Sequence, residues 1–575
     1  MTYKERYESW LNDTNILPEY KEELLSINDE KEIEDRFYRD LEFGTAGLRG
    51  VRGAGTNRMN EHTVGKAAEG LARYLKKKVG VAKIVIAYDS RIKSPEFALY
   101  SAKILAYHGH VAYLYDSLRP VPLLSFAVRY LNADSGIVIT ASHNPSEYNG
   151  FKVYGSYGGQ VTDEDANSIL GEMLAIEDLS EIKTMDQEEA LKSGRIVMIG
   201  DDVDRHYYDS IKTLVIRKGL VKDHAKDLKI LYTPLHGSGN VPVRKILGEL
   251  GYNDVNVVPE QELPDGNFPT APYPNPENPQ VFELALKQNE TLKADIIFGT
   301  DPDADRLGVI VLDKNGTPKV LTGNQTGMLL TDYMLSSLKE EGTLPKDAAI
   351  IKTIVTTESV RKIAAFYGAT LYDVLTGFKY IGEKIEEFIK DDSGTFIFGF
   401  EESYGYSAGA FVRDKDAVVT SMMVCEMALF YKMKDMTLYD ALIDVYDRFG
   451  YFNEGIRSYA KAGKDGAEMI KKSLDYFRAL ELLEINGVKV VKKQDFLLST
   501  DTATDGTITP LTLPKSNVIK YMLEDDSWFV IRPSGTEPKM KAYAAVKGTS
   551  MEDSREKLGV FLSYVDSLVD TSFQA

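Results

Sequence analysis

The chain has 575 residues, a length that predicts roughly four domains at about 150 residues each. Hydrophobic residues make up 43% of it and charged residues 27%, which excludes disordered, collagen-like and disulfide-stapled miniprotein classes. Asp and Glu number 87 against 68 Lys and Arg, a formal net charge of −19. Such a protein is a poor partner for nucleic acid or an anionic membrane, so an anionic substrate must be met by local cations or a metal.

Cysteine usage and hydropathy bear on the compartment. The single Cys425 cannot form an intramolecular disulfide or a multi-thiolate zinc site, and we expect it to be a small buried hydrophobe. The first residues, MTYKERYESWLND, lack the apolar core of a signal peptide. No stretch approaches the ~20 apolar residues of a membrane span. We therefore expect a cytoplasmic protein.

Short apolar runs rich in Val, Ile and Phe recur along the chain, and each ends abruptly in a loop of Gly, Ser, Asp and Pro. They cover residues 83–91, 135–145, 228–240, 294–306 and 394–406. Each run is long enough for a buried strand. Between them lie segments with apolar residues at helical spacing, such as 64–78. This alternation predicts an α/β fold with parallel or mixed sheets, in which ligands gather at the carboxyl ends of strands.

Domain boundaries are expected where this pattern is interrupted. The acidic, polar stretch 173–194 is interpreted as an excursion late in the first domain, and breaks are expected near 204–218, near 320 and around 448–455. The last part has fewer strand–helix–strand signals. We predict domains at 1–210, 211–320, 321–448 and 449–575, the first three α/β with mixed sheets and the last a smaller α+β domain.

The loop TASHNPSEYNGFKVY (140–154) follows an apolar strand. It places the hydroxyl of Ser142 directly after that strand, followed by His143, Asn144 and a proline that ends regular structure. A nucleophile needs such an exposed side chain on a fixed backbone. A simple Ser and Asn turn with a hydrogen-bonded histidine is the alternative.

The loop GTDPDADR (299–306) carries Asp301, Asp303 and Asp305 at alternating positions after another strand. Alternate carboxylates on an extended loop can converge on one hard cation, magnesium or calcium. An EF-hand would need Gly and Glu where this loop has Arg306 and Leu312, so that interpretation fails. A solvated acidic turn is the alternative, although three aspartates at one strand end repel each other without a cation.

Two later loops offer groups for a sugar phosphate. RPSGTEPK (532–539) combines the Arg532 guanidinium, two hydroxyls and a glycine that lets backbone N–H groups point inward, the donors that hold a phosphate. A plain β-turn is the alternative there. GFEESYGY (399–406) offers Glu401 and Ser403 to sugar hydroxyls. FGTAGLRG (43–50) is a Gly-rich turn with Arg49 that matches neither a Walker A nor a GxGxxG pattern.

Taken together, the four loops resemble those of the α-D-phosphohexomutase superfamily, in the family's own order: serine, metal, sugar and phosphate loop. The resemblance covers about residues 44–543. Within the family the sequence is most similar to the larger bacterial phosphoglucomutases, on FEESYGY, LTGFKYIG (375–382) and RDKDA (413–417). Phe400 stands where relatives usually have Gly, and Gly405 where bifunctional relatives have His. The family's four-domain architecture around a central cleft is implied.

The resemblance implies a role for each matching residue. Ser142, phosphorylated in the resting enzyme, would donate its phosphoryl group to the sugar, and Mg²⁺ would be held by Asp301, Asp303, Asp305 and a phosphoserine oxygen. Arg306 and Arg49 would add positive charge. The proton acceptor is left open among His143, Lys152 and Lys415, of which the two lysines could equally be phosphate contacts. The predicted substrate contacts are Arg306, Thr376, Gly377, Glu401, Ser403, Arg413, Lys415, Arg532, Ser534, Gly535 and Thr536.

The implied activity is interconversion of glucose 1-phosphate and glucose 6-phosphate, with glucose 1,6-bisphosphate as intermediate and activator. The phosphate loop would lie on a mobile fourth domain, because a site that encloses both phosphates must open. Phosphomannomutase or phosphopentomutase activity, a glucose 1,6-bisphosphate synthase that uses an acyl phosphate, and a non-catalytic sugar-phosphate sensor are alternatives. The partners expected are small sugar phosphates, with the protein a monomer or homodimer.

Overall fold

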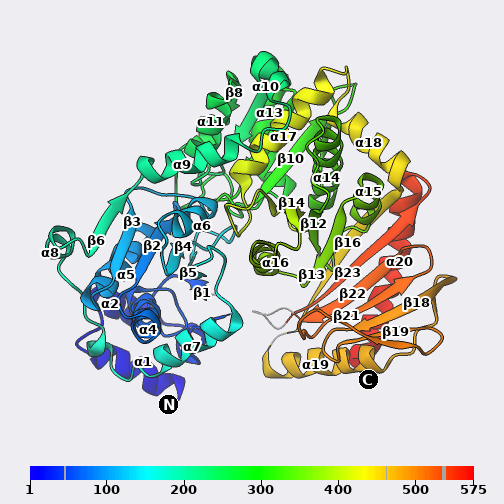
Figure 1. Cartoon of the computed structure of the whole chain (residues 1–575). Coiled ribbons are helices and arrows are strands. Elements are labelled where there is room, and N and C mark those ends of the chain that lie inside the picture. The colour runs from blue at the N-terminus through cyan, green and yellow to red at the C-terminus, as the bar shows by residue number, and fades with distance from the viewer. Residues whose placement is uncertain (45–46, 462, 534–538, 575) are drawn as a thin grey trace. The chain divides into compact units, whose positions relative to one another are not determined.

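The computed structural model describes residues 1–44, 47–461, 463–533 and 539–574 (Figure 1). The chain folds into two compact units. The first comprises Met1–Leu321, Ile381–Phe396 and Ser403–Thr437, and the second comprises Thr322–Tyr380, Ile397–Glu402 and Leu438–Ala575. Helix α16 (Phe378–Asp391) and strand β14 (Thr395–Phe400) therefore have residues in both. No helix among the described residues is long and apolar enough to cross a membrane.

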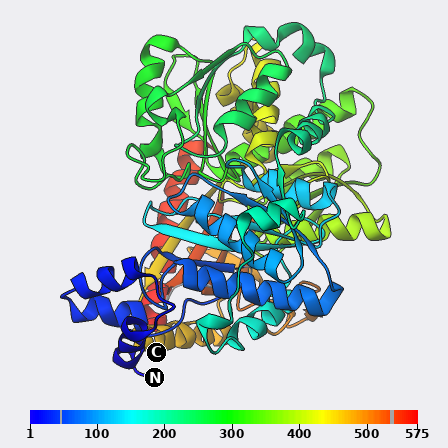
Figure 2. The same ribbon diagram turned by 90° about the vertical axis from the view of Figure 1, so that its left-hand side faces the viewer.

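Three helices precede the first sheet: α1 (Tyr3–Asn12), α2 (Pro18–Ser26) and α3 (Glu30–Phe37). The Thr2 hydroxyl and the Glu5 carboxylate cap α1 reciprocally, which satisfies N–H groups that the helix leaves unpaired. Buried side chains of the three helices, among them Trp10, Leu24 and Phe37, form a small core of their own. The helices make a group at one end of the first unit, dark blue in Figure 2. The sequence analysis did not predict them.

The first unit contains a six-stranded mixed sheet in the order β1-β5-β4-β2-β3-β6. Strands β4, β2, β3 and β6 run parallel, whereas β5 is antiparallel to both β4 and β1. The strands are β1 (Gly47–Val51), β2 (Lys83–Tyr88), β3 (Val111–Tyr115), β4 (Ser135–Ile139), β5 (Tyr148–Gly155) and β6 (Ile196–Ile199). Because β2 and β4 are parallel neighbours, the loops that follow them emerge side by side.

Helices surround this sheet, and side chains of α4, α5 and α7 share a core with its strands. The helices are α4 (Glu61–Val79), α5 (Ser94–Tyr107), α6 (Val121–Tyr130), α7 (Asp163–Leu174), α8 (Gln187–Lys192) and α9 (Asp201–Lys212), with a short 3-10 helix η1 (Leu179–Glu181). Helix α4 confirms the helical spacing predicted for 64–78. It begins at a capping box formed by Asn60 and Thr63.

A second, five-stranded mixed sheet of the first unit has the order β11-β10-β9-β7-β8. Strands β8, β7 and β9 are parallel, and β10 and β11 continue antiparallel. The strands are β7 (Lys229–Thr233), β8 (Asp254–Val257), β9 (Ile296–Thr300), β10 (Leu307–Leu312) and β11 (Pro318–Val320). The sharp β9-to-β10 reversal leaves the aspartate loop, residues 301–306, at the carboxyl end of β9.

The remaining elements of the first unit are helices and one short strand. They are α10 (Lys218–His224), η2 (Ala225–Asp227), α11 (Asn240–Glu249), α12 (Pro259–Glu262), η3 (Pro279–Phe282), α13 (Glu283–Leu292), β15 (Tyr406–Ala408) and α17 (Ala417–Lys432). Cys425 lies buried in α17, as predicted, and burial raises the pKa of its thiol.

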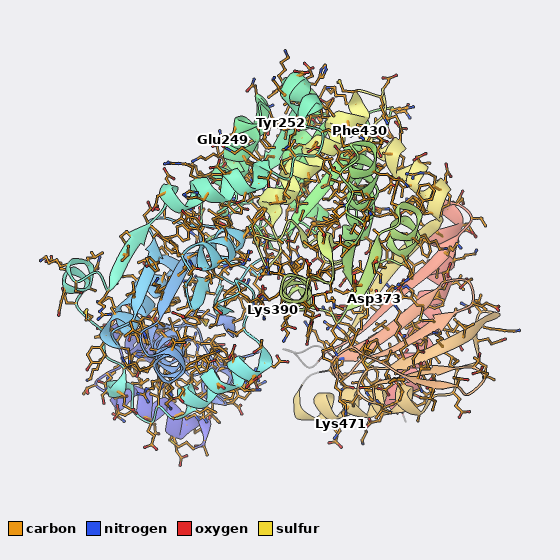
Figure 3. All side chains as sticks on the ribbon, in the orientation of Figure 1. Glu249, Tyr252, Asp373, Lys390, Phe430 and Lys471 are labelled. Atoms are coloured by element: carbon orange, nitrogen blue, oxygen red, sulfur yellow. The ribbon has the colours of Figure 1, made fainter. Side chains whose placement is uncertain are left out.

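The second unit has an α/β part and a β-rich part. In the α/β part β12 (Ala348–Thr353) and β13 (Thr370–Val374) pair in parallel beside helices α14 (Gly323–Glu340), α15 (Ser359–Tyr367) and α18 (Leu438–Phe449). Asp373 of β13, labelled in Figure 3, pairs with the buried Lys352 Nζ at 2.8 Å.

An eight-stranded antiparallel sheet forms the β-rich part, in the order β16-β23-β22-β21-β18-β19-β20, with β17 beside β18. Its strands are β16 (Tyr451–Ala460), β17 (Glu484–Ile485), β18 (Val488–Asp495), β19 (Thr500–Ala503), β20 (Ile508–Pro510), β21 (Ile519–Leu523), β22 (Trp528–Pro533) and β23 (Lys539–Gly548). Helices α19 (Gly463–Ala479) and α20 (Met551–Gln574) share a core with these strands.

The predicted fold class is confirmed: mixed α/β sheets precede a carboxyl-terminal β-rich region, and each of the five apolar runs contains a strand. The expected boundaries at 210, 320 and 448 stay a prediction. The two compact units follow a different division, because they separate parts of the expected third domain.

Candidate active site

The serine loop leaves β4 and holds Ser142 in an unusual backbone conformation. Ser142 has a φ of 52° and is 3% exposed. Its N–H donates to Thr140 Oγ1 at 2.8 Å, which stabilises the turn locally. The Ser142 hydroxyl donates to Asp301 Oδ2 at 2.9 Å and lies 3.1 Å from His143 Nδ1. The serine oxygen therefore faces the aspartate loop.

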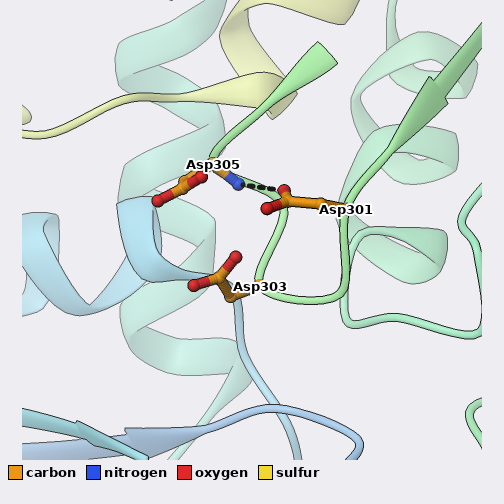
Figure 4. Close-up of side chains that lie close together, drawn as sticks. All are labelled: Asp301, Asp303 and Asp305. Atoms are coloured by element: carbon orange, nitrogen blue, oxygen red, sulfur yellow. Dashed lines mark hydrogen bonds between the residues drawn. The ribbon is translucent and has the colours of Figure 1, made fainter. Parts of the chain in front are cut away.

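Asp301, Asp303 and Asp305 converge (Figure 4). All three are buried, and each offers a carboxylate oxygen within 4.8 Å of the others. The backbone N–H of Asp305 donates to Asp301 Oδ1 at 3.1 Å, the dashed line of Figure 4. Neighbouring elements fix the loop: Val121 N–H donates to the Asp303 carbonyl at 3.0 Å, and Ser238 N–H to the Pro302 carbonyl at 2.8 Å.

The donor atoms of this trio fit a divalent cation. Among the described residues, Asp303 Oδ1 and Asp305 Oδ1 are buried without a hydrogen-bond partner. Buried polar atoms are normally satisfied, so two orphaned carboxylate oxygens beside a third carboxylate point to a ligand between them. Oxygen-only ligands are those of a hard cation such as magnesium.

The acidities of the trio show how strongly the three charges oppose one another. Burial and the neighbouring Asp303 and Asp305 carboxylates raise the pKa of Asp301 well above its usual value, and burial and Asp303 raise that of Asp305. Burial also opposes ionisation of Asp303, but Lys152 and the hydrogen bond with Asp301 lower its pKa below the usual range. A bound cation would stabilise all three as carboxylates.

Two lysines that the sequence marks as candidate site residues form ion pairs with the trio. Lys152 Nζ, from β5, pairs with Asp303 Oδ2 at 3.0 Å, and Lys415 Nζ pairs with Asp305 Oδ2 at 3.1 Å. Lys415 also contacts Asp414 Oδ1 at 3.1 Å. Each lysine thus places a positive charge against one carboxylate of the trio.

Glycine at position 405 makes room for one of these lysines. A Cβ on Gly405 would lie 2.2 Å from Lys415 Cδ, far inside van der Waals contact. Gly405 also forms a β-bridge with Arg306 beside the aspartate loop. Gly405, which stands where bifunctional relatives have His, therefore leaves the space that the Lys415 side chain fills.

Two predicted arginines lie near the serine and aspartate loops. Arg306 pairs with Glu277, and its Nε lies 3.9 Å from Asp305 Oδ1. Arg49 is on β1, exposed, with Nη1 3.5 Å from Asn144 Oδ1 in the serine loop.

Arg413 lies in a different environment. It is fully buried, its Nη2 pairs with Glu386 Oε2 at 3.2 Å, and its Nη1 donates to the Ala410 and Val412 carbonyls. These contacts indicate a packing role, and its predicted substrate contact gains no support from them.

His143 is half-buried beside the nucleophile. Burial, with the positive charges of Arg306 and Arg49, holds the pKa of its imidazole well below the usual value. The ring is therefore held neutral, with Nδ1 3.1 Å from Ser142 Oγ, where it can accept a hydrogen bond from the serine hydroxyl.

The other predicted substrate contacts are divided by the unit boundary. Ser403 belongs to the first unit, whereas Thr376, Gly377, Glu401 and Arg532 belong to the second. Within the second unit, Gly377 N–H donates to Glu401 Oε1 at 2.9 Å, so the two expected sugar loops meet. Ser534, Gly535 and Thr536 lie outside the described residues.

Sequence reasoning missed Thr140. Its hydroxyl accepts from Ser142 N–H, lies 2.6 Å from Asp89 Oδ2 and lies 3.2 Å from Asp303 Oδ2. Thr140 was part of the serine loop read from the sequence, but its role depends on a second strand and a second sheet, which no local pattern reveals.

Comparison with known proteins agrees with this geometry. Family models described as phosphoglucomutase/phosphomannomutase, alpha/beta/alpha domains I, II and III, match residues 40–180, 205–316 and 322–449. The phosphoglucomutase of Staphylococcus saprophyticus is 35% identical over 562 residues, which cover 97% of this chain and 99% of that protein.

Solved structures share the fold. The open form of parafusin, a phosphoglucomutase from Paramecium, superposes with a TM-score of 0.67 at 17% identity, over 93% of this chain and 95% of that one. The N-acetylphosphoglucosamine mutase of Aspergillus fumigatus, solved with GlcNAc-6P and magnesium, gives a TM-score of 0.52 at 14% identity, over 93% and 96% of the two chains. The matched family models and the curated relative together show that this chain belongs to the α-D-phosphohexomutase superfamily, in its phosphoglucomutase branch.

Proposed function

We propose that this protein is a phosphoglucomutase that interconverts glucose 1-phosphate and glucose 6-phosphate. The observation that carries the proposal is the contact between the Ser142 hydroxyl and the buried aspartate trio, with Oγ 2.9 Å from Asp301 Oδ2. A phosphohexomutase needs a hydroxyl that can carry a phosphoryl group beside a divalent cation. The curated relative of nearly equal length carries the same activity in its name.

In this mechanism Ser142 carries a phosphoryl group in the resting enzyme. It gives the group to the free hydroxyl of the sugar phosphate, which forms glucose 1,6-bisphosphate, and the proton of that hydroxyl ends on Ser142 Oγ. After the bisphosphate turns over, Ser142 attacks the other phosphate and the sugar oxygen leaves with the proton. His143 Nδ1, 3.1 Å from Ser142 Oγ, is placed to accept a hydrogen bond from that hydroxyl between the steps.

Asp301, Asp303 and Asp305 would hold Mg²⁺, which the oxygen-only donor set favours. When bound, the ion offsets negative charge on the transferring phosphoryl group. Lys152 and Lys415, each about 3 Å from one carboxylate of the trio, contribute two further positive charges. Their ion pairs favour phosphate contacts over proton transfer for both lysines.

Substrate recognition is proposed for groups that the structure divides between the units. Thr376, Gly377, Glu401 and Ser403 would contact the sugar, and Arg532, with Ser534, Gly535 and Thr536, would hold the phosphate that does not react. Arg306 and Arg49 would steer the reacting phosphate. The hydrogen bond from Gly377 to Glu401 supports a shared role for their two loops.

The experiment that tests the function combines one substrate panel with one pair of variants. We expect the wild-type protein with Mg²⁺ and glucose 1,6-bisphosphate to turn over glucose 1-phosphate with the highest kcat/KM among the 1-phosphates of glucose, mannose, glucosamine and ribose. Ser142→Ala should lose nearly all turnover and still fold, because only the attacking oxygen is removed. Ser146→Ala, in the same loop, is the matched control and should keep the wild-type rate.

Three results would contradict the proposal. A Ser142→Ala variant with the wild-type rate would exclude a phosphoserine mechanism. Preference for mannose or ribose phosphate would identify a different mutase, and bisphosphate formation that requires an acyl phosphate donor would identify a synthase. Sedimentation of the same samples would decide between monomer and homodimer, and the cytoplasmic location stays a prediction.

A further inference from the structure

The turn after β2, residues Asp89 to Arg91, lies against the serine loop. Strand β2 is the parallel neighbour of β4, so both strands deliver their following loops to one edge of the sheet. From the sequence alone this segment is expected to be a strand and a loop, with no functional role. Neither Asp89 nor Arg91 belongs to the proposed metal or substrate contacts.

The Arg91 guanidinium donates hydrogen bonds to the serine loop. It is 1% exposed. Nη2 donates to the Ser142 carbonyl at 2.6 Å and the Asn144 carbonyl at 2.5 Å, and Nη1 donates to the Pro145 carbonyl at 2.7 Å and the Tyr148 carbonyl at 3.0 Å. Four carbonyls of one loop are thus held by one rigid, planar group.

Asp89 provides the charge that lets this arginine be buried. Its Oδ2 lies 3.2 Å from Arg91 Nε, and its Oδ1 accepts from the Arg91 N–H at 2.9 Å and from Ser94 Oγ at 2.9 Å. A buried cation without such a partner would be costly. Asp89 Oδ2 also accepts from Thr140 Oγ1 at 2.6 Å, so the pair reaches the residue that precedes the nucleophile by two.

Thr140 connects this pair to the aspartate loop of the other sheet. Its Oγ1 accepts the Ser142 N–H at 2.8 Å and lies 3.2 Å from Asp303 Oδ2. The serine loop follows β4 of the first sheet, and Asp303 follows β9 of the second. One hydroxyl therefore fixes the nucleophile's backbone and touches a proposed metal ligand.

A loop beside the second sheet closes on the other face of Arg91. The guanidinium carbon lies 5.0 Å from the centroid of the Phe268 ring, within range of a cation–π contact. Phe268 has a φ of 47°. At Gly266 a Cβ would lie 2.5 Å from the Ile92 N atom, so only glycine allows the two loops to approach this closely. Arg91 thus contacts the loop that follows β4 of the first sheet and a loop beside the second sheet.

We propose that Arg91, supported by Asp89 and Thr140, is a positioning residue that holds the Ser142 oxygen toward the aspartate trio. This inference rests on the proposed phosphoryl transfer and adds a residue that acts through the nucleophile without touching substrate. Two features of Ser142 require such support. Its backbone has a left-handed conformation, and its side-chain oxygen lies in a buried, acidic site. Phosphoryl transfer depends mainly on positioning and charge, so loss of this support affects the chemical step.

The test compares four variants of the full chain with the wild type. Arg91→Lys keeps the charge but replaces a planar fork with a point donor that cannot reach four carbonyls. Thr140→Val removes the hydroxyl, whereas Thr140→Ser keeps the hydroxyl and removes only the methyl group. Arg119→Lys is the matched control, because Arg119 pairs with Asp204 at 2.7 Å in the same unit and its side chain makes no hydrogen bond to the serine loop in the part of the chain that the structure describes. Each variant is measured for kcat and KM with glucose 1-phosphate, for Ser142 phosphorylation by intact mass, and for Tm.

We expect Arg91→Lys to lower kcat by about 10²-fold, the cost of a misplacement near 1 Å. KM should change by less than about threefold, since the proposed phosphate and sugar contacts are untouched. Thr140→Val should lower both kcat and the fraction of Ser142 that is phosphorylated. Thr140→Ser should keep both close to their wild-type values. Arg119→Lys should lower Tm alone.

The proposal is overturned if Arg91→Lys loses no more kcat per folded molecule than Arg119→Lys. If Arg91→Lys does not fold, the Thr140 pair decides: equal kcat for Thr140→Val and Thr140→Ser would overturn it. A wild-type protein that shows no mutase activity would instead contradict the proposed function, which the same assay reports separately.

Discussion

At the scale of single residues, Asp303 of the aspartate trio has its two carboxylate oxygens in different surroundings. Its Oδ2 is shared by Lys152 Nζ at 3.0 Å and Thr140 Oγ1 at 3.2 Å, while its Oδ1 is buried without a partner among the described residues. The first oxygen is held by the protein, and the second is left for a ligand. Removing this one charge should therefore act on the cation more than on the fold.

We expect Asp303→Asn to lower the affinity of the enzyme for Mg²⁺, so that more Mg²⁺ is needed for activity. The loss of affinity should exceed the 10- to 100-fold that is typical of residues that only support a metal ligand. An amide oxygen is a weaker ligand than a carboxylate, and Lys152 would lose its counter-charge. The measurement is an Mg²⁺ titration of activity, together with calorimetric titration of the metal alone.

Asp209→Asn is the control for this prediction, since Asp209 lies on the exposed surface of α9 and, within the described residues, forms an ion pair only with Lys212. It removes the same charge far from the trio. An Asp303→Asn protein whose Mg²⁺ titration matched that of Asp209→Asn would show that the trio does not bind the activating ion.

Much of the site could be predicted at this scale, because the serine and aspartates stand directly after apolar runs whose strand nature is legible in the sequence. The structure places Ser142, His143, Lys152 and Lys415 close to the trio, and their roles stay predictions. Arg91 could not be predicted. Its function depends on β2 lying next to β4, a long-range pairing that leaves no mark in the residues around it.

At the scale of elements, the start of α17 combines a helix cap with a buried acid. Asp416 accepts from Val419 N–H at 2.9 Å, and Tyr207 Oη donates to its carboxylate at 2.8 and 2.9 Å. Burial raises the pKa of this carboxyl to about 7. The helix that follows Lys415 therefore begins at a group that titrates near neutrality.

This raised pKa predicts a pH dependence of stability. The folded protein keeps a proton on Asp416 at pH values where the unfolded chain, with an aspartate pKa of about 3.9, has released it. Stability therefore falls as the pH rises from about 4 to about 7, and the loss is complete above the folded pKa. We expect Asp416→Asn, which cannot titrate, to lose less Tm than the wild type between pH 5 and pH 8.

Thermal unfolding at four pH values in that range measures the effect. Asp201→Asn, a change on an 85% exposed side chain of α9, should leave the wild-type slope unchanged. Parallel curves for the wild type and Asp416→Asn would show that this carboxyl is already ionised in the folded protein at pH 5.

Helices and strands could be predicted where burial requires apolar residues at a regular spacing in the sequence. The five apolar runs became strands because both faces of their sheets are covered, and α4 followed its apolar stripe. Helices α1 to α3 were missed. Their cores hold few residues, among them Trp10 and Phe37, so short polar stretches dominate the local pattern.

At the scale of the whole molecule, the second unit contains a buried charge cluster that joins its α/β part to its antiparallel sheet. Glu358 Oε1 pairs with Lys352 Nζ at 3.2 Å and with Lys520 Nζ of β21 at 3.1 Å, and Lys520 also donates to the Ile354 carbonyl at 2.9 Å. Burial favours a neutral Glu358, but the two lysines lower its pKa below the usual range. The carboxylate is thus a permanent bridge.

We expect Glu358→Gln to lower the free energy of unfolding by about 3–5 kcal/mol, the usual cost of leaving buried charges without their partner. Both lysines are fully or nearly fully buried and would keep less counter-charge. Urea unfolding followed by fluorescence measures the change. Glu556→Gln, on the exposed surface of α20, is the control and should fall within about 0.5 kcal/mol of the wild type. A similar small change for Glu358→Gln would show that the cluster does not hold the two parts together.

At this scale the sequence gives no sign of the contacts that join distant parts of the second unit, and the expected domain boundaries stay a prediction. Composition and turn residues indicated breaks near 320 and 448, but side-chain clusters across those points cannot be seen in sequence. A second such cluster packs Ile354, Val355 and Leu375 against Trp528, Val530 and Tyr543. The phosphate-binding Arg532 proposed here, expected on a separate mobile domain, consequently shares a compact unit with Thr376, Gly377 and Glu401.

The left-handed backbone at Ser142 restricts which hydroxyl amino acid can serve at this position. Threonine offers the same oxygen, but its branched Cβ is strained at a φ of 52°. The added methyl group would also need space in a pocket where the serine is only 3% exposed. Replacement of serine by threonine, although chemically conservative, would therefore be strained here, so the backbone geometry favours serine as the proposed phosphate carrier.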